Sequence, residues 1–328
     1  MKKKKVLLME EEFSVVGFGC WAISGSNTWN NSNDDDSIKA VQKAVELGVN
    51  FFDVAPVYGF GHAEEVLGKA LKDSRSKVLI ATKCGLVWDD RYRIENRLTA
   101  ESIYREIDDS LRRLHTDYID IYQIHWPDPN TPIEETMEAL INIQKAGKIR
   151  YIGVSNFPID LTKKAMELAA IVSQQCLYNM LERNEESYHG IPLEYRTEKE
   201  ILPFCKEKGQ AFFPYSPLCQ GLLTGVFKET GNFDDNDVRA NNPKFKGSIF
   251  KKYLNVVEKL KGIANSINKP LSQLAINWLI QKDEVTSVIS GAQNINHVEE
   301  NVDSVSWELS DDIIKEIDHI LSTFEKTC

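Results

Sequence analysis

The stretch YIDIYQIHWPDPNTPIEETMEALINIQKAG, residues 118–147, contains the unit from which the fold is built. It starts with an apolar and β-branched run at 118–125, which is typical of a buried strand. A helical pattern follows over 133–146, with Pro132 suited to its first turn and Gly147 just past its end. This order of strand and helix recurs along the chain.

Eight strand-like runs of this kind are present. The other seven lie at 16–23, 49–54, 78–83, 149–156, 171–175, 211–217 and 286–292. Regular alternation of strands and helices implies a parallel sheet, whose strands are buried on both faces. Eight such units in about 300 residues predict a closed (β/α)8 barrel, an α/β fold, formed as a single domain over 1–328.

A doubly wound open sheet is the alternative. Its dinucleotide-binding version should carry Gly-x-Gly-x-x-Gly early in the chain, whereas GFGCWA at 17–22 supplies only the first two glycines. We therefore predict the barrel. Two insertions interrupt it: a polar segment at 219–250 after the seventh strand, and 178–196, which carries Tyr, Arg and His residues. Loops of such length in a compact domain are usually lids or binding loops.

The composition limits the class of protein. The chain has 328 residues, 42% hydrophobic, and a formal net charge of −10, which argues against nucleic-acid binding and favours small molecules or other proteins as partners. Only four apolar residues separate Lys2–Lys5 from the acidic run at 10–12, too few for a secretion signal, and no apolar stretch approaches the roughly 20 residues of a membrane helix. The six scattered cysteines form no Cys-x-x-Cys pair. We predict a soluble cytoplasmic protein without a metal site; the sequence gives no oligomeric state.

The carboxyl ends of barrel strands meet at one rim, where the active site lies. In chain order the strand-like runs end on Trp21, Asp53, Lys83, His125, Ser155 with Asn156, Gln175, Tyr215 and Gly291, and Tyr58 lies on the loop after the second run. Each ionisable group also has a purely structural explanation. Asp53 and Lys83 could form a rim ion pair, His125 could be packed in the core, and Tyr58 could anchor a turn.

Taken together, these groups have complementary chemistry. A phenol titrates near 10, and an ammonium about 4 Å away lowers its pKa by up to about three units, so we expect Lys83 to acidify Tyr58. Asp53 can keep that lysine charged, and His125 can donate a ring N–H to a carbonyl oxygen. Such a set suits reduction of a carbonyl or oxidation of an alcohol, with the hydride held by a cofactor.

The order Asp53, Tyr58, Lys83, His125 resembles the catalytic tetrad of the aldo-keto reductases, which are (β/α)8 barrels with nicotinamide cofactors. The segments DVAPVYGFGHAEEVLGKAL, DSLRRLHTDYIDIYQIHWPD, GKIRYIGVSNF, YSPLCQGLLTG and GAQNINHVEEN are similar to the family's signature blocks. The likeness covers nearly the whole chain. Within the family it looks closest to the bacterial general-aldehyde and inositol-cluster reductases and to the related potassium-channel β subunits.

The resemblance implies a role for each matching residue. Tyr58 would be the general acid, Lys83 and Asp53 would tune it, and His125 would orient the carbonyl. The cofactor would be bound by Trp21, Asp53, Ser155, Asn156, Gln175, Tyr215, Ser216, Pro217, Leu218, Gly221, Leu222, Gly291, Gln293, His297, Glu300 and Asn301. Of these, Ser155, Asn156 and Gln175 would bind the carboxamide and Tyr215 would stack on the nicotinamide. The substrate pocket would be lined by Trp21, Trp88 and Trp126, which could instead be core residues.

The chain departs from the family where the 2′-phosphate of NADP would lie. Relatives often have cations at the positions of Val226, Gln293 and His297. The smaller number of cations makes NADH use possible, although Arg239, Lys244 and Lys246 of the long loop could compensate. We predict NADPH as the cofactor and an aldehyde, ketone or sugar-like carbonyl as the substrate, with the reverse oxidation possible. The alternatives are a channel-associated regulatory subunit with slow turnover and a cofactor-free barrel lyase or isomerase.

Overall fold

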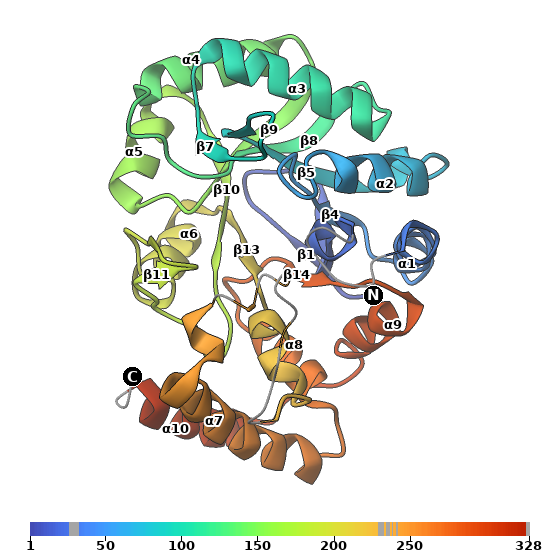
Figure 1. Ribbon diagram of the computed structural model, residues 1–328, viewed down its shortest axis with the longest axis vertical. Coiled ribbons are helices and arrows are strands. Elements are labelled where there is room, and N and C mark those ends of the chain that lie inside the picture. The colour runs from blue at the N-terminus through green and yellow to red at the C-terminus, as the bar shows by residue number, and fades with distance from the viewer. Residues whose placement is uncertain (26–32, 229–232, 234–236, 238, 241, 326–328) are drawn as a thin grey trace.

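The computed structural model describes residues 1–25, 33–228, 233, 237, 239–240 and 242–325. Eight parallel strands form the centre and helices surround them (Figure 1). The strands are β3 (Val16–Gly19), β4 (Phe51–Asp53), β5 (Leu79–Cys84), β8 (Ile119–Ile124), β9 (Ile149–Ser155), β10 (Ile171–Leu177), β13 (Ala211–Tyr215) and β14 (Val288–Gly291). The predicted (β/α)8 barrel is confirmed, and every predicted run overlaps one of these strands.

The strands follow one another around the barrel in chain order. Each strand from β4 to β13 in this series pairs with the one before it, and β14 pairs with β3. The seventh and eighth strands are joined at their starts, where the Thr286 N–H donates to the Phe212 carbonyl at 2.9 Å. The carboxyl ends of all eight strands therefore lie at one rim.

Ten α-helices lie in the described part of the chain. They are α1 (Asp34–Glu46), α2 (His62–Ala70), α3 (Ala100–Leu114), α4 (Ile133–Lys145), α5 (Ile159–Leu168), α6 (Leu202–Lys208), α7 (Gly247–Ser266), α8 (Leu271–Ile280), α9 (Ile295–Asp303) and α10 (Asp311–Glu325). In Figure 1, α7 and α10 lie together at the lower edge, where the rings of Tyr253 and Phe324 are 5.2 Å apart. No helix among the described residues is both long and apolar enough to cross a membrane.

The unit at 118–147 shows why the sequence folds in this way. Every residue of β8 is buried, and Pro132 directly precedes the first residue of α4. The buried face of α4 includes Met137, Leu140 and Ile143. These positions recur at helical spacing, so one stripe of the helix packs against the barrel while its charged residues face water.

A hairpin closes the bottom of the barrel. Strands β1 (Lys3–Lys5) and β2 (Glu12–Ser14) pair antiparallel and bring Phe13 under the barrel. The ring of Phe13 lies 5.3 Å from Phe51 and 5.5 Å from Phe213, and all three side chains are fully buried. Each buried ring contributes about 1.5–3 kcal/mol of hydrophobic stabilisation. The lower half of the barrel is thus a packed core, and the polar groups gather at the upper rim.

The long loops lie at that rim. A hairpin of β6 (Leu86–Trp88) and β7 (Ile94–Asn96) follows β5, and a second hairpin of β11 (Ser187–Tyr188) and β12 (Ile191–Pro192) follows β10. The predicted polar segment 219–250 begins with a 3₁₀ turn, Cys219–Thr224, and its last four residues belong to α7 instead.

A buried carboxyl on α3 makes the stability of the fold depend on pH. Burial raises the pKa of Glu106 to about 7, although Gly85 N–H and the Ser102 hydroxyl both donate to it. Between pH 4.5 and 7 the folded chain keeps a proton that the unfolded chain has lost, so stability falls as pH rises. The free energy of unfolding should therefore fall between pH 5 and pH 8. We expect this fall to be roughly 2–3 kcal/mol smaller in Glu106→Gln than in the wild type. Urea unfolding at both pH values measures this; an equal loss in the two proteins would contradict it.

Candidate active site

The four predicted catalytic residues meet at the rim of the barrel. Lys83 Nζ lies 2.9 Å from both carboxylate oxygens of Asp53 and 3.3 Å from the Tyr58 hydroxyl. A third acceptor, the Val54 carbonyl, lies 2.9 Å from the same amine. Lys83 is completely buried, and Asp53 is 2% exposed. The ring of His125 stands edge-on to Tyr58, 5.9 Å between centroids.

A tight turn positions the phenol. Residues 55–61 fold back on themselves through Tyr58 N–H to the Ala55 carbonyl at 3.1 Å and Gly61 N–H to the Pro56 carbonyl at 2.7 Å. Gly59 has φ +63, and a Cβ there would come within 2.0 Å of the Ser24 carbonyl oxygen. Only glycine fits that position, which explains why the sequence places one directly after the tyrosine.

The expected acidification of Tyr58 is wrong for the cofactor-free protein. Burial raises the pKa of the Tyr58 phenol well above its usual range, and the Asp53 carboxylate adds to the rise. The lysine charge does not offset this because both oxygens of Asp53 lie against the same amine and neutralise it. The phenol therefore carries its proton at physiological pH, a state in which it can donate the proton.

The imidazole of His125 is neutral. Burial, followed by the charge of Lys83, holds its pKa well below the usual range. Its backbone is braced on both sides: His125 N–H donates to the Cys84 carbonyl at 3.0 Å, and its carbonyl accepts from Asn156 Nδ2 at 3.1 Å. A neutral ring offers one N–H donor, which suits binding of an uncharged carbonyl oxygen.

Asn156 is the centre of this support. Its Nδ2 donates to the His125 carbonyl and to Ser155 Oγ, and its Oδ1 accepts from the hydroxyls of Tyr195 and Tyr215, each at 2.9 Å. All four hydrogen bonds of the amide are thus made within the protein, so its assignment to the cofactor carboxamide requires one of them to open. Gln175 instead donates to Asp53 Oδ1 at 2.7 Å and fixes the carboxylate.

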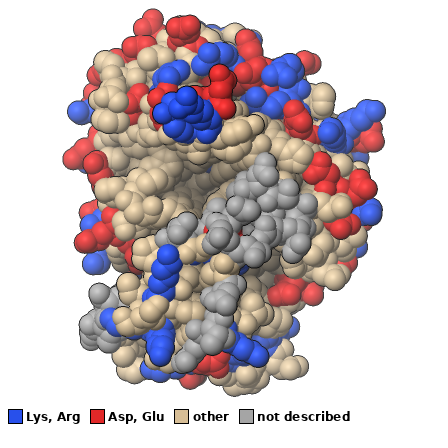
Figure 2. All heavy atoms as spheres, in the orientation of Figure 1, with Lys and Arg blue, Asp and Glu red and all other residues tan. Residues whose placement is uncertain are grey.

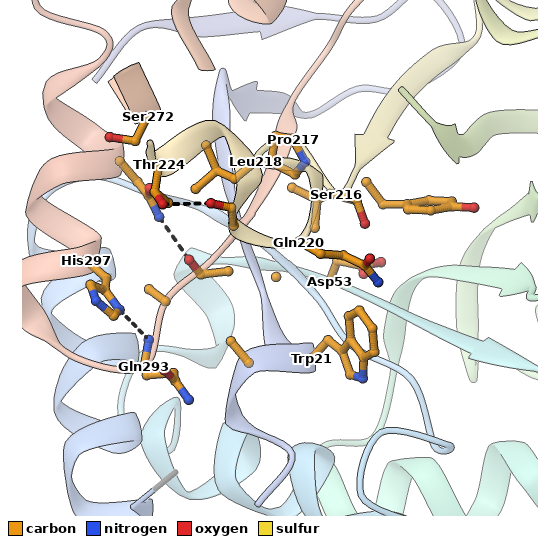
Figure 3. A pocket seen from close by; sticks show the side chains of 18 of the residues that line it. Trp21, Asp53, Ser216, Pro217, Leu218, Gln220, Thr224, Ser272, Gln293 and His297 are labelled. Carbon is orange, nitrogen blue, oxygen red and sulfur yellow. Dashed lines mark hydrogen bonds between the residues drawn. The ribbon is translucent and has the colours of Figure 1, made fainter. Parts of the chain in front are cut away.

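A cavity of about 1070 Å³ opens beside these residues. Figure 2 shows a hollow near the middle of the face that is turned to the viewer in Figure 1, with mostly uncharged residues around it. The close view in Figure 3 has Trp21 and Asp53 on one side and Ser272, Gln293 and His297 on the other, with the loop of Ser216–Gln220 between them. The cavity is therefore elongated and reaches from the catalytic residues to the start of α8 and α9.

Most of the predicted cofactor residues line this cavity. They are Trp21, Asp53, Ser155, Asn156, Gln175, Tyr215, Ser216, Pro217, Leu218, Gly221, Arg239, Gly291, Gln293, His297, Glu300 and Asn301. Of the residues expected around the substrate, Trp126 also lines it, as do Tyr58 and His125. Lys83 is fully buried and is not among the residues that line the cavity.

Four of the residues predicted for the cofactor or the substrate do not line the cavity. Lys244 is buried in an ion pair with Glu182, which also accepts from Asn179, so its charge is already neutralised and is not available to a phosphate. Leu222 is fully buried in the core. Trp88 packs against Phe60, with ring centroids 5.5 Å apart. Lys246 of the same loop is exposed and also lies outside the cavity lining.

Other lining residues were not predicted. The most polar are Tyr188, His189, Gln220, Lys261, Lys269 and Ser272. The first two belong to the insertion 178–196, whose Tyr and His content was the available signal. Lys261 and Lys269 lie near the end of α7, and no motif distinguishes them from the other lysines of that amphipathic helix and the loop after it.

The far end of the cavity suits a polar ligand. Gln293 Nε2 is buried and has no hydrogen-bond partner among the described residues, although it faces this space. The loop after β13 has consecutive left-handed residues, Cys219, Gln220 and Gly221, directly after Leu218. Turns of this kind form anion-binding backbone concavities. An unpaired donor and such a turn along one elongated cavity fit a dinucleotide.

Comparison with known proteins shows the family of the chain. The family described as "Aldo/keto reductase family" matches residues 15–322. "Aldo-keto reductase YhdN" of Bacillus subtilis (strain 168) is 37% identical over 315 residues, covering 94% of this chain and 90% of that protein. The "NADH-specific methylglyoxal reductase" of Escherichia coli (strain K12) is 34% identical over 325 residues, covering 95% of both chains.

A solved structure is similar over the same length. The glycerol dehydrogenase from Gluconobacter oxydans superimposes with a TM-score of 0.86 at 34% identity, covering 98% of this chain and 95% of that one. Family and fold coincide across nearly the whole sequence. The chain therefore belongs to the aldo/keto reductase family and is an NAD(P)-dependent oxidoreductase.

Proposed function

We propose that the protein reduces a small aldehyde or ketone to the alcohol, with Tyr58 as the general acid. The observation that carries this proposal is the position of the Tyr58 hydroxyl, which lines the cavity, lies 3.3 Å from Lys83 and is next to the ring of His125. A bound reduced nicotinamide would supply the hydride to the carbonyl carbon.

Four residues of the chain have separate roles in the proposed reaction. His125 donates its N–H to the carbonyl oxygen and holds it beside the phenol, and Tyr58 gives that oxygen a proton as negative charge develops there. Lys83 then stabilises the phenolate at hydrogen-bond distance, while Asp53 keeps the amine in place. The raised pKa keeps the phenol protonated at neutral pH, so its proton is present when a substrate binds, and the cation of Lys83 favours release of that proton because it stabilises the phenolate.

The test is a titration with NADPH and NADH followed by a screen of carbonyl and polyol substrates. Quenching of protein fluorescence by the cofactor with rapid turnover of small carbonyls supports the proposal. Binding with negligible turnover on every carbonyl would favour a regulatory subunit of the same fold. Cofactor-independent elimination or isomerisation would favour a lyase or isomerase. Methylglyoxal and glycerol, named for two relatives, belong in the screen.

The cofactor proposal is NADPH in preference to NADH. Two lysines, Lys261 and Lys269, line the cavity near the start of α8. Arg239 of the long loop lines it as well, but both carboxylate oxygens of Asp237 already accept from its guanidinium, so the preference rests on the two lysines. Their charges favour a cofactor that carries an additional phosphate. The neutral amide of Gln293 at the same end limits that preference, and one relative is named as NADH-specific.

Gln293→Arg should raise the preference for NADPH. A guanidinium at this position adds a charge-assisted hydrogen bond to the 2′-phosphate, which we expect to increase the ratio of kcat/KM for NADPH over NADH by about 10-fold or more. Steady-state kinetics with both cofactors measures the ratio. Gln293→Met, which has a similar size but no charge, is the control. An unchanged ratio in the arginine variant would mean that the phosphate lies beyond reach of this residue.

We also propose that the protein acts in the cytoplasm. All five cysteines in the described part of the chain are buried thiols without a disulfide partner. Unpaired cysteines are the rule in a reducing compartment.

A further inference from the structure

His189 is placed at the cavity by the hairpin of β11 and β12. It has a left-handed backbone, φ +51, and is followed by Gly190 at φ +79, so the chain reverses there. Its ring stands edge-on to Trp21, 6.5 Å between centroids, and Trp21 in turn lies 6.4 Å from Tyr58. All three residues line the same cavity. A substrate held at Tyr58 and extending past Trp21 therefore meets His189.

A chain of hydrogen bonds fixes which ring nitrogen of His189 carries the proton. The Lys244 N–H donates to Asn242 Oδ1 at 3.0 Å, so the other end of that amide, Nδ2, must be a donor. It donates to Gln220 Oε1 at 2.8 Å, which leaves Gln220 Nε2 as the atom facing His189 at 2.6 Å. An amide nitrogen only donates, so His189 Nε2 accepts.

The second ring nitrogen of a neutral histidine then carries the proton. Burial lowers the pKa of His189, and the charge of Lys244 lowers it further. The ring is therefore neutral, with its hydrogen on Nδ1. That N–H has no hydrogen-bond partner among the described residues. His189 is exposed at the rim of the cavity, so this N–H is left to solvent or to a ligand there, separate from the catalytic residues.

We propose that His189 binds a hydroxyl or second carbonyl oxygen of the substrate, and so selects hydroxylated aldehydes and ketones over simple aliphatic ones. This inference rests on the proposed carbonyl reductase function. The surroundings support it. The remaining wall near Tyr58 is aromatic, with Trp21 and Trp126, and offers an alkyl chain and a polyol chain similar apolar contact. The oriented N–H of His189 then favours the substrate that carries an oxygen at this position.

Two substitutions of His189 test the role without straining the hairpin. Glycine and asparagine both tolerate the positive φ of this residue. His189→Gly removes the donor, whereas His189→Asn keeps an amide N–H near the position of Nδ1. Turnover of glyceraldehyde against propanal, and of erythrose against butanal, is measured for the wild type and both variants with the preferred cofactor.

The expected result depends on the substrate. His189→Gly should lower kcat/KM for the hydroxylated aldehydes by roughly 3- to 10-fold, mainly through KM, and leave propanal and butanal unchanged. His189→Asn should recover most of the loss. An equal loss on all four aldehydes, or no loss on any, would overturn the proposal, because neither result depends on a substrate hydroxyl.

A binding experiment separates this proposal from the proposed function. If the wild type turns over no carbonyl, the reductase assignment fails, but titration of the cofactor-bound protein with erythritol still reports on His189. Weaker erythritol binding in His189→Gly than in the wild type and His189→Asn would support the proposal, and equal binding in all three would overturn it. Nitrogen-15 chemical shifts of labelled histidine should show the proton of His189 on Nδ1 in the wild type. A proton on Nε2 would refute the hydrogen-bond chain.

Discussion

Tyr58→Phe should lower kcat for carbonyl reduction by about 10²- to 10⁴-fold, the usual contribution of a positioned general acid. The substitution removes only the hydroxyl. The ring keeps its contacts with Trp21 and His125, and Lys83 keeps its three other acceptors, both oxygens of Asp53 and the Val54 carbonyl. Cofactor affinity and thermal stability should therefore stay close to those of the wild type.

Stopped-flow and steady-state kinetics, combined with a fluorescence titration of the cofactor, separate the two effects. Tyr92→Phe is the matched control, since Tyr92 is 64% exposed on the loop between β6 and β7. It should leave kcat unchanged. Turnover of Tyr58→Phe within 10-fold of the wild type would refute the assignment of the proton donor. A parallel loss of cofactor binding would mean that the phenol has a structural role as well.

The sequence was sufficient to predict that the four proposed catalytic side chains meet, because of how a barrel is built. Asp53, Lys83 and His125 end consecutive apolar runs, and in a parallel barrel such ends converge whatever the loops do. The contact between Lys83 and Asp53 follows from neighbouring strands in register, with Asp53 paired to Ala81 two residues before the lysine. Two side chains that point inward from adjacent strands at nearly the same height must meet.

Burial and pairing were not predictable in the same way. The charge of Lys244 suggested a phosphate ligand, but a sequence does not show that this lysine forms an ion pair with Glu182, 62 positions away. The expected acidification of Tyr58 was wrong for a similar reason. The positive charge of the lysine is visible in the sequence, whereas its neutralisation by Asp53 and the burial that raises the pKa of the phenol depend on the folded site. His189 and Gln220 meet only because two loops with left-handed residues bend towards each other.

Lys83→Met is expected to have the second large effect, on both activity and stability. The amine is fully buried against Asp53, and its removal leaves a carboxylate that is 2% exposed with Gln175 as its remaining partner. Breaking a buried ion pair from one side costs about 3–5 kcal/mol. Turnover should fall as well, since the phenolate formed on proton donation loses its cation, and the pH–rate profile should change.

The dependence of this loss on pH identifies its cause. Burial already raises the pKa of Asp53, and the lysine is the main group that lowers it. Without Lys83 the folded pKa rises further above the unfolded value, so the stability deficit should be small at pH 5 and grow as the pH rises towards 8. Urea unfolding across this range measures it. The double variant Asp53→Asn with Lys83→Met should regain stability, because no buried charge remains, yet stay inactive. A deficit independent of pH, or a double variant with normal turnover, would show that the ion pair does not act as described.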